Sequence, residues 1–299
     1  MPSLRARIVA QVVAHDRASS PLRDLDALDD RLAQGVPARR FRPPAPLRRA
    51  VRVARGSVAG RPCHRLAPRG APAGRHVVYF HGGGFVNEIT LWHWLFLTRL
   101  VRAAGCTVTV PMYELVPRAR ARESVGAALA IVRALAAERP VLMGDSAGAN
   151  LALAAAQAAR DAGVPAAGEV VLLSPWVDLT LRNPEIPAVA PLDPMLGAEA
   201  LAEAGRRYAG DDDPGRPPAS PLHGDLSGLG RLTILTSTHD ILHPDARRLR
   251  DLAGAAPGTT VSWFEEPDVV HDWMMLPMPE AGAAVARLAE LLSRPASTP

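Results

Sequence analysis

The segment that most constrains the fold of this chain is Val141–Asn150, VLMGDSAGAN. An apolar run with strand character ends at Gly144, and a helix of small residues follows almost at once. Between them lies Gly-x-Ser-x-Gly with Ser146 at its centre, the pattern of a nucleophile elbow, in which the residues two before and two after the Ser must lack bulk. The pattern alone is weak because Gly and Ser are common in turns. The flanking strand and helix make a catalytic Ser146 the favoured interpretation.

Apolar runs and helical patterns alternate through most of the chain. The runs predict strands buried on both faces at 77–80, 106–110, 140–143, 170–173, 232–235 and 260–264. Helical patterns separate them at about 92–104, 120–137, 147–162, 244–253 and 280–292. Strands that alternate with helices indicate βαβ units and a mainly parallel sheet, so we predict an α/β fold.

Three regions depart from this alternation. Residues 1–35 have helical apolar spacing and lead through a Pro-rich connection to two short strands, 50–54 and 63–67, which predict an antiparallel edge hairpin separated by Gly56 and Gly60. Residues 183–218 are Pro-rich and contain one helical pattern, and an insertion of this length commonly covers an active site. We therefore expect cap helices in 1–45 and a main domain in 46–299 that carries a cap insertion at about 183–218.

Charge and cysteine content narrow the class of protein. The net charge of +4 comes from scattered arginines, since the chain contains no Lys, and only residues 39–49 are locally basic, so we expect no nucleic-acid partner. Cys63 and Cys106 do not make a disulfide framework and suit a reducing compartment. No signal-peptide pattern is present, and the apolar run 91–101 is too short to span a bilayer. We expect a cytoplasmic protein with no stable membrane insertion.

A glycine-rich turn, His81-Gly82-Gly83-Gly84-Phe85, directly follows the first buried strand. Consecutive glycines allow backbone N–H groups to face open space, where they can stabilise the oxyanion of acyl transfer, by about 3 kcal/mol for each donor. A phosphate-binding loop would require a Lys and a Ser or Thr at set spacing, and neither is present. The N–H of Ala147, at the start of the helix after Ser146, is the expected further donor.

A Ser nucleophile needs a base that an acid orients, and in α/β hydrolases the acid and the base follow the Ser in that order. His271 follows the last predicted strand and is our candidate base, although a single loop His is more often simply solvated. Asp240 comes soonest after the strand at 232–235 and is our candidate acid, whereas Asp245 suits the start of the next helix. Asp272 is a neighbour that would tune charge. The other histidines show no metal-ligand spacing, so we expect no metal and no cofactor.

Taken together, the glycine-rich turn and the elbow resemble the hormone-sensitive-lipase family of α/β hydrolases, its bacterial family IV esterase branch. Further elements fit over about 75–290, namely Tyr113 with Pro117, Ser174–Leu179 and Ser220–Leu222. The resemblance implies a mostly parallel eight-stranded sheet flanked by helices with a helical cap. It also implies the roles of Ser146 as nucleophile, His271 as base, Asp240 as orienting acid, and Gly83, Gly84 and Ala147 as oxyanion-hole donors. Ala149 and Glu114 depart from the family pattern, which usually has Gly and Arg there.

The resulting hypothesis is a serine carboxylesterase that hydrolyses small-molecule esters, short-chain or alicyclic, through an acyl-enzyme. A lactone hydrolase or an amide deacetylase with the same triad stays open, as does a non-catalytic binding protein on this fold and assembly into a homodimer. The candidate substrate-binding residues are four aromatic side chains, although aromatic residues more often belong to the core: Phe85, Trp92, Trp176 and Trp273.

Overall fold

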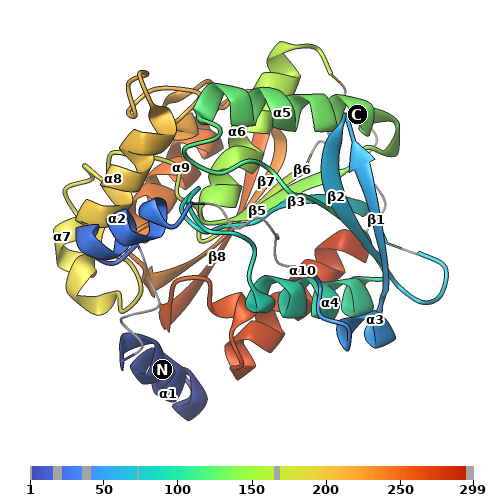
Figure 1. Ribbon diagram of the computed structural model, residues 1–299, viewed down its shortest axis with the longest axis horizontal. Helices are drawn as coiled ribbons and strands as arrows, with labels where there is room; N and C mark the ends of the chain where they lie inside the picture. The colour runs from blue at the N-terminus through green and yellow to red at the C-terminus, as the bar shows by residue number, and fades with distance from the viewer. Residues whose placement is uncertain (1, 16–21, 36–41, 73, 165–168, 294–299) are drawn as a thin grey trace.

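An eight-stranded sheet forms the centre of the protein in the computed structural model, which describes residues 2–15, 22–35, 42–72, 74–164 and 169–293 (Figure 1). The strand order is β1-β2-β4-β3-β5-β6-β7-β8, in which β2 is antiparallel to both of its neighbours, β1 and β4, and the other neighbouring strands run parallel. The strands are β1 (Arg52–Val58), β2 (Arg61–Ala67), β3 (His76–Phe80), β4 (Thr107–Pro111), β5 (Val141–Asp145), β6 (Glu169–Leu173), β7 (Gly230–His239) and β8 (Thr259–Val270). The predicted α/β fold is confirmed.

Helices cover both faces of the sheet. In Figure 1, α5 and α6 lie above the sheet, whereas α4 and α10 lie below it. The main helices are α1 (Leu4–His15), α2 (Leu25–Ala33), α3 (Leu47–Ala50), α4 (Leu91–Ala104), α5 (Ala121–Ala134), α6 (Ala147–Asp161), α7 (Ile186–Val189), α8 (Ala198–Ala209), α9 (His243–Ala255) and α10 (Pro279–Ser293). The helices predicted from periodicity all occur, with ends shifted by a few residues.

The two helical layers explain why the central strands are apolar throughout. Side chains alternate along a strand, so Val78 and Phe80 of β3 belong to the core beneath α5 and α6, whereas Val77 and Tyr79 belong to the core beneath α4 and α10. All four are fully buried. Residues of a strand that is covered on both sides have no solvent-facing positions, and this gives the continuous runs seen in the sequence.

The edge hairpin is confirmed, but its strands differ from the predicted ones. β1 begins at Arg52 and continues through Gly56, whose position in the strand leaves ordinary space for a Cβ atom. The turn consists of Ala59 and Gly60 alone, and both have positive φ, 49° and 75°. Gly56 therefore does not interrupt the strand, because of the two glycines only Gly60 lies where the backbone is left-handed.

The N-terminal segment and the long insertion meet beside the sheet. Figure 1 shows α2 next to α8. The amide of Gly197 donates to the carbonyl of Leu22 at 2.9 Å, and Arg207 forms an ion pair with Asp29 at 2.8 Å. A Cβ atom at Gly197 would lie only 1.9 Å from the carbonyl oxygen of Arg23, so this crossing requires Gly. The two segments are thus directly connected.

Within the described ranges, no helix is both long and apolar enough to cross a bilayer. Cys63 and Cys106 are buried free thiols. Residues 39–41 of the locally basic stretch lie outside the described residues, as do residues 16–21 of the predicted N-terminal helices.

Candidate active site

Ser146 occupies a strained turn at the carboxyl end of β5. Its φ and ψ are 51° and −118°, a conformation that side-chain-bearing residues rarely adopt, and its amide donates to the carbonyl of Leu173 in β6 at 2.9 Å. The flanking glycines are required. A Cβ atom at Gly144 would lie 2.2 Å from the carbonyl oxygen of Gly148, and one at Gly148 would lie 2.0 Å from that of Phe80. The local sequence thus produces the elbow predicted from Gly-x-Ser-x-Gly.

His271 and Asp240 meet because the two strands before them are neighbours. β7 and β8 run parallel, so residues that follow each strand reach the same edge of the sheet. The Asp240 carboxylate is fully buried, and its Oδ2 lies 2.7 Å from Nδ1 of His271, while its Oδ1 accepts from the amide of Leu242 at 2.9 Å. Asp245 instead lies in the first turn of α9, where Asn183 donates to it at 2.9 Å. The structure therefore brings Asp240, and not Asp245, to His271.

A cavity of about 480 Å³ opens at this edge, and Gly83, Ser146 and His271 all line it. Its apolar wall comes from separate parts of the chain: Val13, Leu22, Trp92, Pro194, Met195, Leu196, Met275 and Leu276. Its polar lining includes Arg23, Asn87, Glu88, Thr90, His93, Asp145 and Asp272. The volume suits a small organic molecule, and the mixed lining is typical of a ligand site.

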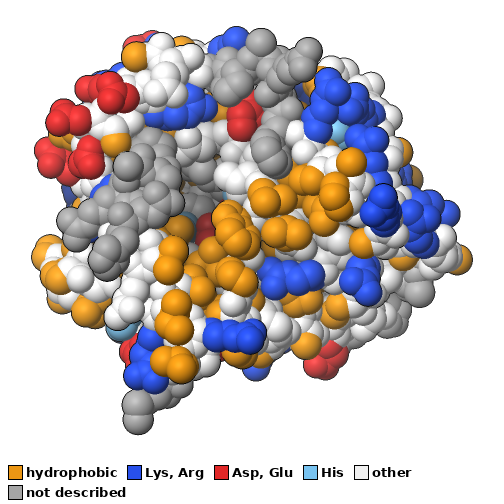
Figure 2. Space-filling model, turned by 60° about the horizontal axis from the view of Figure 1, so that its bottom comes forward, with side chains coloured by type: hydrophobic (Ala, Val, Ile, Leu, Met, Phe, Trp, Pro, Cys, Tyr) orange, Lys and Arg blue, Asp and Glu red, His pale blue; other side chains and the backbone are white. Residues whose placement is uncertain are grey.

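The surface beside this cavity is unusually apolar. Leu4, Ile8 and Val12 follow one another at helical spacing on α1 and are exposed, as are Leu91 and Trp92 at the start of α4. Figure 2, which brings the lower part of Figure 1 forward, shows hydrophobic side chains gathered across the middle of this face. Trp92 belongs both to this surface and to the cavity wall, so the apolar lining continues outward.

Of the candidate oxyanion-hole residues, Ala147 directly follows Ser146 and Gly83 lines the same cavity. Gly83 and Gly84 have φ of 113° and 61°, values that favour Gly, and a Cβ atom at Gly83 would lie 2.8 Å from the carbonyl oxygen of Asn87. Within the described part of the chain, the amides of Gly83, Gly84 and Ala147 donate to no protein acceptor. Unused donors at the end of a buried strand and at a helix N-terminus are suited to bind an oxygen that acquires negative charge.

Asp145 connects the glycine-rich turn to the elbow, a role that sequence spacing did not indicate. Its fully buried carboxylate accepts from the Tyr79 hydroxyl, from the amide of Gly82 at 2.9 Å and from Nε2 of His93 at 3.1 Å. Burial alone would raise the pKa of Asp145, but the charge and hydrogen bond of His93 and the bond from Tyr79 outweigh it and lower that pKa. The aspartate beside the nucleophile is therefore a structural anion that holds the two loops in register.

Tyr113 supports the same turn from the other side. Its hydroxyl donates to the carbonyl of His81 at 2.6 Å, and its ring stacks on the His81 imidazole with centroids 4.5 Å apart. These two contacts give the Tyr that follows β4 a structural role, whereas the sequence motif had shown only its position.

The imidazole of His271 lies between two carboxylates. Asp240 contacts Nδ1, and Oδ2 of Asp272 lies 3.2 Å from Nε2. Burial alone would lower the pKa of His271, but the two carboxylates outweigh burial and raise it well above 6.5. Burial also raises the pKa of Asp272 to about 6, although the charge of His271 partly opposes this. Asp272 thus contacts the candidate base directly, and spacing alone had indicated only a nearby charge.

Another carboxylate, Asp193, reaches the acid loop from the long insertion. Its Oδ2 accepts from the amide of Ile241 at 3.0 Å, and its Oδ1 accepts from the amides of Met195 and Leu196 at 2.7 and 3.0 Å. Burial and the nearby charge of Asp240 raise the pKa of Asp193 to about 6. The insertion is therefore fastened to the loop that carries Asp240, a contact that no sequence motif predicted.

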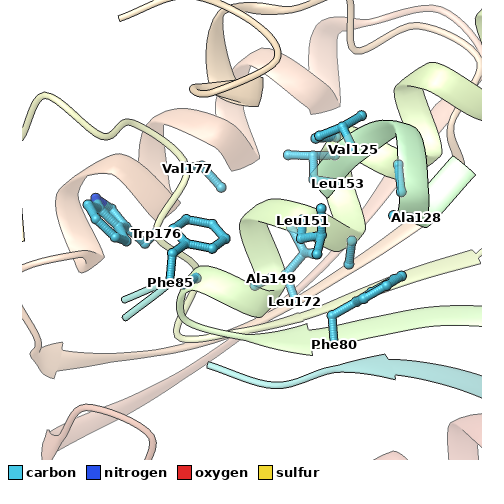
Figure 3. Packing of buried hydrophobic residues seen from close by; sticks show 14 of the residues in the cluster. Phe80, Phe85, Val125, Ala128, Ala149, Leu151, Leu153, Leu172, Trp176 and Val177 are labelled. Carbon is cyan, nitrogen blue, oxygen red and sulfur yellow. The ribbon is translucent and has the colours of Figure 1, made fainter. Parts of the chain in front are cut away.

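The predicted aromatic lining needs correction. Phe85 stacks on Tyr208 with centroids 3.5 Å apart, and Trp176 lies 5.9 Å from Phe85, so both are buried in the core, as Figure 3 shows. Trp273 is 2% exposed and packs in the core on the other side of the sheet. None of the three lines the cavity, because each is covered by helices of the fold. Trp92, at 43% exposure, is the one of the four that does.

Comparison with known proteins places this geometry in a family. A family model described as the α/β-hydrolase fold matches residues 77–275. The crystal structure of an esterase from the bacterial hormone-sensitive lipase (HSL) family superposes with a TM-score of 0.82 at 30% identity, over 98% of this chain and 99% of that one. The chain belongs to the hormone-sensitive-lipase family of α/β hydrolases.

Other hydrolases are similar to this chain in sequence or structure. An acetyl-hydrolase of Streptomyces hygroscopicus is 38% identical over 205 residues, which cover 67% of this chain and 68% of that protein. An esterase of Acinetobacter venetianus is 30% identical over 231 residues, which cover 74% and 75%. A hormone-sensitive lipase from a metagenome library superposes with a TM-score of 0.81 at 29% identity, over 96% and 98% of the two chains. The resemblance inferred from the two glycine motifs is confirmed.

The acidic run of this family member, Asp211–Asp213, consists of ion-paired surface side chains. Asp211 pairs with Arg120, the N-cap residue of α5, at 2.7 Å, and Asp212 pairs with Arg122 of α5 at 2.6 Å. In the ranges that the structure describes, no group of three or more His, Cys, Asp or Glu side chains is arranged to hold a metal ion.

Proposed function

We propose that this protein is a serine carboxylesterase that acts on small esters through an acyl-enzyme. The observation that carries the proposal is the buried Asp240–His271 pair, 2.7 Å apart, which borders the same cavity as the strained Ser146. A serine hydroxyl needs a base that is oriented by a third group, and these three residues supply the required types in the chain order expected of α/β hydrolases.

In the proposed reaction, Nε2 of His271 accepts the proton of Ser146 as the hydroxyl oxygen attacks the ester carbonyl. Asp240 holds the other ring nitrogen and stabilises the imidazolium that forms. The carbonyl oxygen becomes negative and accepts hydrogen bonds from the amides of Gly83, Gly84 and Ala147. The imidazolium then protonates the leaving alcohol, and water releases the acid from the serine by the same steps in reverse.

We further propose that residues 1–45 and the insertion at about 183–218 act together as a cap over the cavity. The support is that Val13, Leu22 and Arg23 come from the first segment and Pro194–Leu196 from the second, and that all of them line the cavity. Arg23 also donates to the carbonyl of Pro194, which joins the two segments at the cavity. A cap of this kind excludes water from the acyl-enzyme and limits the size of the substrate.

The substrate we propose is a short-chain or alicyclic ester. A cavity of about 480 Å³ with an apolar wall accommodates either type. The name of the Streptomyces relative, acetyl-hydrolase, favours a short acyl group and keeps removal of acetyl from an amide as the second candidate. Esters and anilides with the same acetyl group separate the two, and a panel that varies acyl and alcohol size independently defines the ester class.

The test of the mechanism is Ser146→Ala with Ser57→Ala as its control, because Ser57 is an exposed serine of β1. We expect Ser146→Ala to lower kcat for 4-nitrophenyl acetate by at least about 10⁴-fold and Ser57→Ala to leave it unchanged. Intact mass measured during turnover should show an added acetyl group on the wild-type chain and none on Ser146→Ala. Undiminished turnover by Ser146→Ala in a folded protein would overturn the proposal.

A further inference from the structure

Asp272 has a carboxylate that the fold does not use. Its backbone is left-handed, with φ of 53°, and its amide donates to Oγ of Ser174 at 3.1 Å. The short helix η5 (Trp273–Met275) that follows donates no hydrogen bond to this side chain. Oδ1 is buried without a hydrogen-bond partner in the described residues, and Oδ2 lies 3.2 Å from Nε2 of His271. A buried carboxylate oxygen without a donor is costly unless a ligand supplies one.

The other ionisable side chains of the cavity lining have partners of their own. Three carboxylates line the cavity, those of Glu88, Asp145 and Asp272, together with the guanidinium of Arg23. Asp145 is already compensated by three donors, and the guanidinium of Arg23 is directed to the carbonyl of Pro194. Asp272 is a lining carboxylate that keeps an oxygen without a donor in the described residues, and Asp240 and Asp272 together face the single imidazole of His271. The partly exposed ring of Trp92 adds an aromatic surface of the kind that attracts cations.

The position of Asp272 defines which part of a substrate it meets. The leaving oxygen of an ester must come within about 3 Å of Nε2 of His271 to be protonated. Oδ2 of Asp272 lies 3.2 Å from that same nitrogen, so it is adjacent to a leaving group that meets Nε2. An ammonium two carbons beyond the ester oxygen is roughly 3–4 Å from that oxygen and can reach the carboxylate.

We propose that Asp272 forms a subsite for a positively charged nitrogen in the leaving group, so that esters of amino alcohols are preferred over neutral esters of the same shape. The inference rests on the proposed esterase mechanism, because it assumes that the leaving group meets Nε2 of His271. An ionised carboxylate beside the leaving group attracts a cationic alcohol and repels an anionic one.

The same contact predicts an effect on turnover as well as on binding. Without a ligand, the Asp272 carboxylate lies at Nε2 of His271, where it competes with the Ser146 hydroxyl for that nitrogen. A cationic leaving group gives the carboxylate another partner and frees Nε2 to act as the base. Removing the charge of Asp272 should therefore lower kcat/KM for a cationic ester and raise or preserve it for a neutral one.

The test compares acetylcholine with 3,3-dimethylbutyl acetate, in which a carbon replaces the charged nitrogen. Wild-type enzyme should favour acetylcholine in kcat/KM by about tenfold, and Asp272→Asn should remove the preference. Asn tolerates the left-handed backbone. Asp272→Gly, which removes the side chain without backbone strain, should also remove the preference for acetylcholine. The matched control is Asp268→Asn, since Asp268 is also an aspartate with a left-handed backbone, φ 57°, but pairs with His239 away from the cavity lining.

Several results would overturn the inference without affecting the esterase proposal. One is equal turnover of the two acetates by a wild-type enzyme that hydrolyses 4-nitrophenyl acetate. Another is an equal fall for both acetates in Asp272→Asn, which would indicate a structural role. A loss of preference in Asp268→Asn would show that the effect comes from overall charge. Failure of the esterase proposal itself would instead appear as activity that survives Ser146→Ala.

Discussion

Two buried histidine–aspartate pairs border the same cavity, and they differ in what the second ring nitrogen meets. In His93–Asp145, Nε2 contacts the carboxylate at 3.1 Å and Nδ1 accepts from the amide of Thr90 at 3.1 Å. In His271–Asp240, Nδ1 contacts the carboxylate at 2.7 Å and Nε2 faces the cavity beside Asp272. Both nitrogens of the first ring contact groups that hold the fold, whereas Nε2 of the second ring meets the Asp272 carboxylate at the cavity.

This difference teaches that a buried imidazole–carboxylate pair does not by itself indicate a catalytic group. His93 lies in the first turn of α4 and completes a capping box with Thr90, so both of its nitrogens stabilise the fold. His271 follows a strand at the carboxyl edge of the sheet, and no backbone group of the described residues takes its second nitrogen. The four predictions below test this contrast between a structural and a chemical pair.

The largest expected effect is on the His271–Asp240 pair. We expect His271→Ala to lower kcat for 4-nitrophenyl acetate by about 10⁴-fold or more, because no other group of the proposed site can accept the Ser146 proton. Circular dichroism should show a folded protein. The contrast would fail if His93→Ala cost more activity than His271→Ala.

Next in size is the orienting acid. Asp240→Asn should lower kcat by about 10³–10⁴-fold, because an amide beside Nδ1 stabilises neither the required tautomer nor the imidazolium. Asp245→Asn is the matched change in α9 and should cost less than about tenfold, because Asp245 contacts Asn183 and not the imidazole. Equal losses in steady-state kinetics would mean that the acid is misassigned.

A smaller effect on activity, with a larger one on stability, is expected at the His93–Asp145 pair. His93→Ala removes a donor from buried Asp145 and the partner of Thr90, which should lower the free energy of unfolding by roughly 2–4 kcal/mol. Urea denaturation measures this change. Activity should fall by only about tenfold, through loosening of the turn that Gly82 shares with Asp145. An unchanged stability together with a loss as large as that of His271→Ala would contradict the structural role.

The smallest effect is on pH dependence. His271 serves as a base only when it is neutral, and the carboxylates of Asp240 and Asp272 raise its pKa well above 6.5, so kcat/KM should rise toward alkaline pH. Asp272→Asn removes one carboxylate and lowers that pKa, so the acid limb for a neutral ester should move to lower pH by about one unit. A movement to higher pH would show that Asp272 does not act on the imidazole.

The sequence predicted the parts of the site that depend on local patterns. Ser146 lies in a turn that two glycines make possible, and Asp240 and His271 each follow an apolar run, so strand and turn patterns, together with the acid-then-base order of α/β hydrolases, indicated them as candidates. The His93–Asp145 pair was not predicted, because Asp145 and His93 are 52 residues apart and belong to no common motif. Phe85 and Trp176 were misassigned to the cavity since nothing in their neighbourhood distinguishes a core aromatic residue from a lining one.

What the sequence by itself determined is the alternation of strands and helices, the elbow at Ser146 and the order of the candidate acid and base, since these follow from periodicity and from residues that only certain turns accept. Only the tertiary structure decided which carboxylate meets which imidazole. Asp240 and His271 come within 2.7 Å across 31 residues because β7 and β8 are neighbours in the sheet. Asp272 reaches the same ring because the backbone is left-handed at Asp272, directly after His271. Such pairings depend on strand order and side-chain direction, which local sequence does not contain.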